Sequence, residues 1–260
     1  MIDYSFSIYD LEYFLLILVR VSMFIYLAPF FSMSNTPRNV RIILSVIVSI
    51  LLYYTLTPAQ AIVTDSLVEL SFIVIKEAVV GLLIGFSCNI CVSILTFAGA
   101  LADMETGLSM VQIFDPASRQ NVSITGTLYN YSFNMMLIGS GMYMYILGAL
   151  RDTYTLIPVN GAILRSDDLL NSMTMFMTDY VLIGFRIILP IFAAILMLNA
   201  ILGIIAKVSP QMNMFSIGIQ LKILVGLGVL FLTVGLMPAV TDMIYTEMKK
   251  MLVSFVSSMV

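Results

Sequence analysis

Six long apolar runs dominate the sequence, and each approaches the roughly 20 residues that an α-helix needs to span a bilayer. They cover residues 11–31, 42–63, 70–102, 121–150, 180–206 and 223–241. Only 10% of the 260 residues are charged, against about 25% in an average soluble domain. The sequence therefore predicts an all-α polytopic membrane protein with long helices arranged in hairpins, and we expect residues 1–260 to form a single unit.

The composition disfavours nucleic-acid binding, metal chemistry and acid–base catalysis. A net charge of −3 offers no basic surface for a phosphate backbone. The chain has no histidine, and its two cysteines, Cys88 and Cys91, lie within one apolar run, so the four ligands of a zinc site cannot be assembled. No pair of carboxylates is suited to acid–base work. We expect no enzymatic activity, no metal, no cofactor and no nucleic-acid partner.

The charges that flank the first apolar run bear on its orientation. Acidic residues and no lysine or arginine precede the run, unlike the start of a signal peptide, so we expect the run to be retained. Arg38 and Arg41 follow it, which favours an N-terminus outside the cytoplasm. Residues 103–119 then fall on the cytoplasmic side. Lys249 and Lys250 near the end oppose this orientation.

Four charged residues lie in or near the apolar runs. A charge at the centre of a membrane helix costs roughly 2.5–3.5 kcal/mol on insertion scales. We therefore expect Arg20, Glu77 and Arg186 to be buried against protein or water. Lys76 is expected to extend to the headgroups instead. Because Lys76 and Glu77 are adjacent in sequence, they face different sides of a helix and cannot pair well with each other.

A stripe of small and polar residues follows Glu77 at a spacing of four: Gly81, Gly85 and Asn89. Two glycines four residues apart let a second helix approach closely. The stripe predicts a tight helix–helix contact, within the chain or with another subunit.

Prolines indicate where helices are interrupted. Pro29 and Pro190 should kink or end their helices, because proline lacks the backbone donor. Pro210 should end another helix, and Asn213 or Ser216 could cap the one that follows.

Residues 99–120 separate two uncharged runs and contain the densest group of charges and helix breakers nearby. The charges are Asp103, Glu105, Asp115 and Arg119, and the breakers are Gly99, Gly107 and Pro116. Five apolar residues lie among them: Leu108, Met110, Val111, Ile113 and Phe114. A purely solvated connector would not need these, so we expect an irregular loop at about 103–120 that packs against something. An ordinary loop with a few buried side chains remains an open alternative.

Several motifs, in order, resemble the FliR/SctT family of the type III secretion export apparatus. Residues 76–85, KEAVVGLLIG, resemble its E-x3-G-x3-G segment, and residues 98–99, 107–110 and 114–116 resemble its central loop. The C-terminal signature corresponds here to Pro210, Asn213, Phe215, Gly218 and Lys222. The chain departs from the family at Met142 and Gln220, where histidine and proline are common.

The resemblance implies an all-α subunit that assembles with FliP and FliQ into a helical export gate contacted by FlhB. Its substrates would be unfolded exported flagellar proteins. Its place would be the bacterial inner membrane and flagellar basal body, in contact with lipid and reaching towards the periplasmic side. The family's central loop closes the pore as a plug, which corresponds here to Gly107, Leu108, Met110, Val111, Ile113, Phe114, Asp115 and Pro116. Met110 and Phe114 are the candidate blocking side chains.

A polytopic small-solute or ion transporter is the alternative function. Such a protein binds its solute near the midplane, often where related repeats break their helices. The sequence shows no convincing internal repeat and few charges near the middle of its runs. An intramembrane enzyme is a third reading, which the residue types disfavour.

Overall fold

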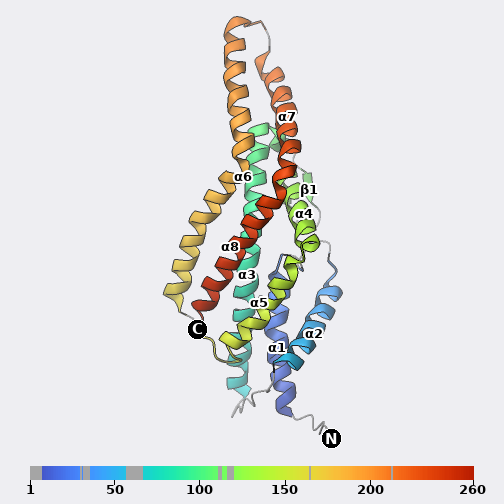
Figure 1. Ribbon diagram of the computed structural model, residues 1–260, viewed down its shortest axis with the longest axis vertical. Coiled ribbons are helices and arrows are strands. Elements are labelled where there is room, and N and C mark those ends of the chain that lie inside the picture. Colours follow the sequence, from blue (N-terminus) through green and yellow to red (C-terminus); the bar gives the residue numbers. More distant parts are fainter. Residues whose placement is uncertain are drawn as a thin grey trace. The chain divides into compact units, whose positions relative to one another are not determined.

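The computed structural model describes residues 8–29, 31, 36–56, 67–110, 113–115, 120–163, 165–211 and 213–260. The described chain is almost wholly helical (Figure 1), and the predicted all-α fold is confirmed. Its elements are α1 (Ile8–Leu27), α2 (Arg38–Thr55), α3 (Leu67–Thr106), η1 (Leu108–Met110), β1 (Ile113–Asp115), β2 (Gln120–Val122), α4 (Ile124–Gly139), α5 (Met142–Leu156), α6 (Ser166–Val208), α7 (Met214–Thr233), η2 (Val234–Leu236) and α8 (Met237–Ser257).

Four helical segments are long and apolar enough to cross a membrane: α2, α3, α6 and the stretch Phe215–Ser257. The bent pair α4–α5 brings the number to five if it counts as one span. Both α3, with 40 residues, and α6, with 43 residues, exceed the roughly 20 residues of a single crossing. These helices make the chain a polytopic membrane protein, and parts of the longest ones extend beyond the length of one span.

The described residues form two compact units, and α3, α6 and α8 contribute to both. The first unit comprises Met1–Ile90, Gly141–Met175 and Glu247–Val260. Within it α1 and α2 lie side by side (Figure 1), and the rings of Tyr13 and Phe14 pack against Tyr53 at centroid distances of 6.3 and 6.1 Å. The backbone nitrogen of Ile163 donates to the carbonyl of Met259 at 2.8 Å, which ties the segment before α6 to the end of the chain.

The second unit comprises Cys91–Ser140 and Phe176–Thr246. A row on α6, including Ile187, Ile191 and Ile195, is buried, because residues four apart lie on one face of a helix. Phe97 of α3 contacts Tyr180 at a centroid distance of 5.1 Å. A Cβ on Gly184 would lie 2.5 Å from the Phe97 ring, so glycine is what lets α6 approach α3 here.

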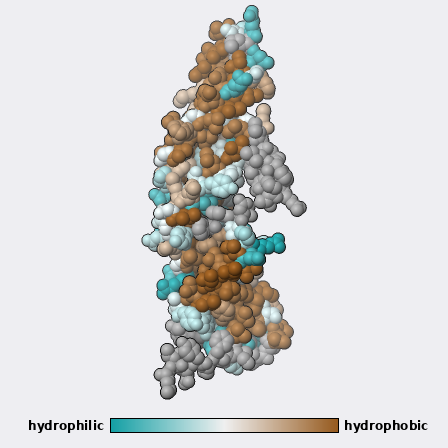
Figure 2. Space-filling view, turned by 90° about the vertical axis from the view of Figure 1, so that its right-hand side faces the viewer, coloured by the Kyte–Doolittle hydropathy of each residue, from teal (hydrophilic) through white to brown (hydrophobic). Residues whose placement is uncertain are grey.

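The outer surface of the hairpin formed by α6 and α7 is strongly apolar. Figure 2 shows hydrophobic residues over most of its upper part, where these two helices lie. Several large apolar side chains there are exposed: Met197, Ile204, Leu224 and Phe231. Such a surface suits lipid or a partner helix rather than water.

The structure has one interruption that the sequence did not predict, and Pro190 does not end its helix, which was one of its two expected effects. The run 121–150 is divided into two helices, α4 and α5, because the chain turns at Gly141, whose φ of 71° is readily adopted only by glycine. Conversely, α6 continues through Pro190 instead of ending there. Proline is tolerated inside membrane helices, where neighbouring groups can satisfy the backbone that it frees.

Other predicted helix ends are confirmed. Helix α1 stops at Leu27, two residues before Pro29. Helix α6 ends at Val208, just before Pro210, and Asn213 caps α7 by accepting a hydrogen bond from the nitrogen of Ser216 at 3.4 Å.

Candidate functional site

The loop between α3 and α4 starts later than the sequence predicted. Residues 99–106, including Asp103 and Glu105, belong to α3 rather than to an irregular loop. The helix continues because a single glycine at position 99 weakens a helix only slightly. It ends at Gly107, whose φ is 83°.

The two helices that carry this loop meet at two glycines. A Cβ placed on Gly99 of α3 would overlap the backbone of Gly126 on α4. Glycine at position 99 permits this approach, because a side chain there would push the helix axes apart. The ends of the loop are thereby held next to each other.

A buried carboxylate strengthens this junction. Asp103 is 3% exposed and accepts hydrogen bonds from the nitrogen and the hydroxyl of Thr125, at 3.3 and 2.5 Å. Ser123 caps the start of α4, where its hydroxyl accepts from the nitrogen of Gly126 at 2.8 Å. A charged acceptor at a helix N-terminus is favourable because it satisfies backbone donors that the helix leaves free.

A third helix closes the junction on the α3 side. Thr106, the last residue of α3, is fully buried, and a Cβ on Gly226 of α7 would overlap its side chain. On α4, Asn130 donates from Nδ2 to the Thr96 hydroxyl at 3.0 Å. Residues 107–122 therefore leave and re-enter a packed junction of three helices.

The described residues of the loop form one short turn and two short strands. Leu108 and Met110 lie in the 3₁₀ turn η1, and Met110 is 72% exposed. The backbones of Ile113, Phe114 and Asp115 form β1, which pairs antiparallel with β2, so that Phe114 lies opposite Asn121. Val111 and Pro116 lie outside the described residues.

In the first unit, Arg20 and Glu77 form an ion pair inside the protein. Arg20 Nε lies 2.6 Å from Glu77 Oε2, and both side chains are 0% exposed. Arg20 Nη1 donates to the carbonyl of Ile157 at 3.0 Å, and its guanidinium carbon lies 4.2 Å from the centre of the Tyr154 ring, a cation–π geometry. Both residues were expected to face protein or water, and the structure places them against protein.

The segment after α5 completes this cluster. Asn160 has a φ of 66°, a left-handed conformation that asparagine tolerates better than most residues. Its nitrogen donates to Glu77 Oε1 at 2.9 Å, and its carbonyl accepts from Lys76 Nζ at 2.9 Å. The neighbours Lys76 and Glu77 thus bind one residue from two sides, and Lys76 does so instead of simply reaching for headgroups.

The glycine stripe after Glu77 lies against α1. A Cβ on Gly81 would overlap the carbonyl oxygen of Arg20, and one on Gly85 would lie 2.8 Å from the carbonyl oxygen of Phe24. Asn89, the last member of the stripe, is half-buried. The closest approach of α1 and α3 is thus directly beside the buried ion pair.

Arg186 was expected to face protein or water, and its side chain is exposed in the single chain, so that expectation stays a prediction. The buried face of α6 at this level carries Ile183, Gly184, Ile187 and Ile188, and Arg186 points away from that face. Its Nη1 lies 4.0 Å from Met243 Sδ.

The residues of the C-terminal signature are spread over the turn between α6 and α7 and the first three turns of α7. Pro210 and Asn213 shape the turn, Phe215 is 72% exposed, and Lys222 is half-buried. A Cβ on buried Gly218 would lie 3.5 Å from Leu202, so this glycine sits at the contact between α6 and α7.

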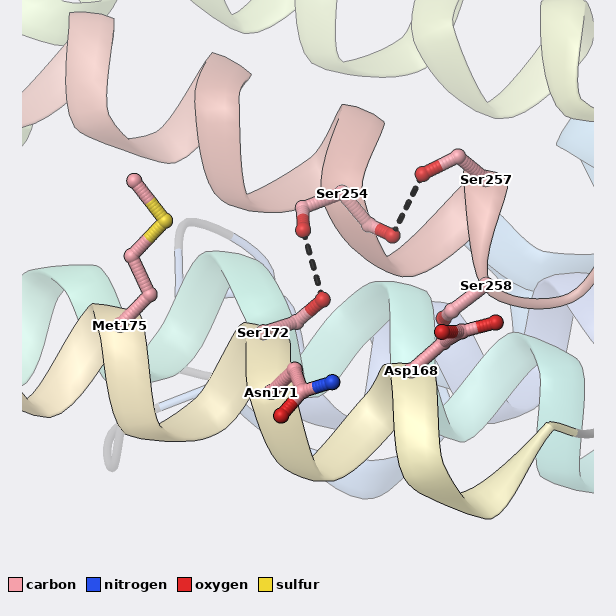
Figure 3. A pocket seen from close by; sticks show the side chains of 7 residues that line it. All are labelled: Asp168, Asn171, Ser172, Met175, Ser254, Ser257 and Ser258. Carbon is pink, nitrogen blue, oxygen red and sulfur yellow. Dashed lines mark hydrogen bonds between the residues drawn. The ribbon is translucent and has the colours of Figure 1, made fainter.

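A polar pocket of about 400 Å³ lies between the start of α6 and the end of α8. Figure 3 shows Asp168, Asn171 and Ser172 from α6 facing Ser254 and Ser258, and the Ser172 and Ser254 hydroxyls are 2.7 Å apart. Asp168 and Asn171 are exposed, so the pocket between the two helix ends is open to the surface of the single chain.

Sequence reasoning missed several residues of these junctions. Thr125 and Gly126 at the loop base, and Tyr154 and Asn160 beside the ion pair, had no assigned role. Ser123 carries one local signal, because serine is a preferred residue at the start of a helix. The partners of Asp103 and Glu77 lie 22 and 83 residues away in sequence, and no local pattern identifies contacts at such a separation.

Long apolar helices, a charge pair buried between them and glycines at their crossings define an all-α polytopic membrane protein. The model of the family described as "Bacterial export proteins, family 1" matches residues 11–248. The chain belongs to this family. Flagellar biosynthetic protein FliR of Escherichia coli (strain K12) is 24% identical over 242 residues, which cover 93% of this chain and 92% of that protein.

Two further relatives give the range of this similarity. FliR of Aquifex aeolicus (strain VF5) is 27% identical over 244 residues, 92% of each chain. Surface presentation of antigens protein SpaR of Shigella flexneri is 25% identical over 162 residues, 62% of each chain. The resemblance to the FliR/SctT family that the motifs predicted is confirmed, and membership of an export family favours protein export over solute transport.

Proposed function

We propose that the chain is a subunit of a bacterial type III export apparatus, and that the segment between α3 and α4 closes its export path. The observation that carries this proposal is the three-helix junction at the base of the loop. Gly99 against Gly126, and Asp103 bound to Thr125, hold the two loop ends together. A loop whose ends are fixed can be displaced and can return without disturbing the helices that carry it.

The residues within the loop suit a seal. Leu108, Met110, Val111, Ile113 and Phe114 are apolar. A narrow apolar constriction loses its water and so blocks ions without filling the whole lumen. Met110 is exposed at the start of the loop, and methionine adapts its shape to irregular surfaces, which is a useful property for a seal that must release and re-form.

The partners follow from the same resemblance. FliP and FliQ would surround the chain, FlhB would contact the assembly, and unfolded exported flagellar proteins would pass through it at the inner membrane and its periplasmic side. The flagellar relatives above match over nine-tenths of the chain, whereas SpaR matches over 62%. This difference favours a flagellar apparatus over a virulence apparatus. Residues 1–260 would act as one unit, with no catalytic or cofactor role.

Deletion of residues 108–114 tests the plug. The deletion removes the apolar segment and leaves Asp103, Thr106 and Thr125 at the junction, so the complex should still assemble. Membranes that contain it should leak ions and small dyes that the unaltered complex retains. The measurement is conductance or dye flux across vesicles, with complex formation followed in parallel. Replacing the same seven residues by a Gly/Ser segment of equal length separates loss of the side chains from shortening of the chain.

Leak from both altered complexes supports a seal made by side chains. An assembled deletion complex that is as tight as the original would refute the plug. The assignment to an export apparatus is tested separately, by whether the chain isolated from its native membrane brings FliP-like and FliQ-like subunits with it.

A further inference from the structure

An apolar recess of about 200 Å³ opens beside Arg186 in the second unit. Ile187 and Pro190 of α6 line it, together with Leu236, Val240 and Met243 from the segment after α7. Tyr129 of α4 and Thr233 supply its hydroxyl groups. The volume is below the roughly 300–1,000 Å³ of pockets that enclose a whole drug-sized ligand, so the recess suits one end or one segment of a longer apolar molecule.

Arg186 places a positive charge at the mouth of this recess. The ion pairs of Arg20 with Glu77 and of Lys250 with Glu247 do not include Arg186. A thioether such as that of Met243 is only a weak acceptor. An exposed guanidinium on a membrane helix is costly unless an anion or water meets it. The charge and the apolar recess together match an anion attached to a hydrocarbon chain.

Pro190 adds an acceptor at the same place. It lacks a backbone N–H and therefore cannot make the helical hydrogen bond to the carbonyl of Arg186, four residues earlier. Position 186 thus offers a cationic side chain and a backbone carbonyl without its usual helical donor. A phosphodiester can bind the guanidinium while a neighbouring hydroxyl donates to the carbonyl. A lone carboxylate can bind the guanidinium but has no donor for the carbonyl.

The length of α6 lets this site lie at headgroup level. The helix has 43 residues, so at 1.5 Å per residue it is about 65 Å long, roughly twice the 30 Å of a bilayer's hydrocarbon core. Arg186 lies near its middle. One half of α6 can therefore cross the hydrocarbon while Arg186 meets the phosphate layer.

We propose that this recess binds an anionic phospholipid of the phosphatidylglycerol type. The phosphate lies on the Arg186 guanidinium, the glycerol hydroxyl faces the Arg186 carbonyl, and a segment of one acyl chain fills the space beside Pro190 and Val240. The site is independent of the proposed plug, because none of its residues belongs to the loop between α3 and α4. The acidic side chain of a partner subunit is the competing occupant, and it would have no use for the apolar recess.

The absence of tryptophan from the chain permits a direct test with the full-length protein in vesicles. Leu189→Trp introduces a single fluorophore at a 60% exposed position, three residues after Arg186 and therefore next to it on the helix surface. The vesicles contain phosphatidylcholine with a small fraction of lipid carrying brominated chains, as either phosphatidylglycerol or phosphatidylcholine. Brominated chains quench only nearby tryptophan.

Quenching by the anionic lipid should exceed that by phosphatidylcholine by roughly fivefold in apparent affinity, the preference expected of one cationic side chain at an anionic surface. Arg186→Gln should abolish the preference, and Arg186→Lys should keep part of it. The matched control is Arg151→Gln, another exposed arginine, on α5 of the first unit. It should leave the preference unchanged.

Equal quenching by the two lipids would overturn the proposal, as would a preference that survives Arg186→Gln. A partner carboxylate would be indicated instead if lipid preference is absent and Arg186→Gln lowers the recovery of the other export subunits with this chain. That result would also overturn the lipid site.

Discussion

Arg20 and Arg186 lie in similar sequence surroundings and in opposite structural ones. Each stands within a long apolar helix, and the same argument from insertion cost predicted both to be buried. Arg20 is 0% exposed and binds Glu77, the Ile157 carbonyl and the face of Tyr154. Arg186 is exposed beside an apolar recess. The cost of a charge thus predicts that something must compensate it, but not whether that partner is inside the chain.

The two arginines differ in what they contact. The Arg20 cluster joins α1, α3 and the segment after α5, three parts of one unit. Buried ion pairs are not strongly stabilising in themselves, but removing one partner leaves an uncompensated charge. Arg186 holds no described element in place, so its task lies towards whatever surrounds the chain.

The largest expected effect comes from breaking the buried pair. Glu77→Leu leaves Arg20 charged and unpaired inside the protein, which should destabilise the fold by about 3–5 kcal/mol. The double variant Arg20→Leu, Glu77→Leu removes both charges and should recover about 1–3 kcal/mol of that loss. The measurement is denaturation of the detergent-solubilised chain, followed by loss of helical circular dichroism.

A double variant that is no more stable than Glu77→Leu would mean that the pair is not the source of the loss. The comparison remains informative even if the single variant cannot be isolated, because the double variant should then still be obtained.

A smaller effect should follow from widening the contact next to that pair. Gly81→Ala puts a methyl group against the Arg20 carbonyl, so that α1 and α3 must shift, at a cost of about 1–3 kcal/mol. Gly148→Ala on α5 is the matched control, because a Cβ there meets no heavy atom within 4 Å. It should stabilise by roughly 0.5–1 kcal/mol, since alanine suits a helix better than glycine.

Both variants are read in the same denaturation measurement. Equal shifts for the two would show that the close approach at Gly81 carries no special weight, and that only helix propensity matters.

The smallest effect on stability is expected at Arg186. Arg186→Leu should change the free energy of unfolding of the isolated chain by less than about 0.5 kcal/mol, as is usual for exposed positions away from special contacts. The same variant should lose the anionic-lipid preference proposed above. A loss of stability as large as that of Glu77→Leu would show that Arg186, like Arg20, is needed for the fold of the isolated chain.

Much of the architecture could be predicted because it depends on local pattern. The apolar runs gave most of the helices, and the breaks near Pro29 and Pro210 followed from proline's missing donor. The bend at Gly141 was missed, because an apolar run looks the same on both sides of a turn. Helix α6 continues through Pro190, because a proline's effect depends on whether neighbouring groups compensate it.

The residues of the candidate site could also be predicted only in part. The sequence picked out residues 107–116 as a break between uncharged runs, and it picked out Glu77, Gly81 and Gly85 as a stripe on one face. The structure assigned the partners: Asn160 and Arg20 for Glu77, and Thr125 for Asp103. Those pairings join distant parts of the chain, so they depend on how the helices cross and not on any spacing along one of them.

The sequence by itself determined that this protein is helical, that it belongs in a membrane and that its charges are few enough for each to need compensation. Hydrophobic burial and backbone hydrogen bonding impose those properties on any chain with such long apolar runs. Only the tertiary structure decided which charges are compensated within the chain. A helix presents every face to its surroundings, and which face becomes buried is settled only when another helix packs against it.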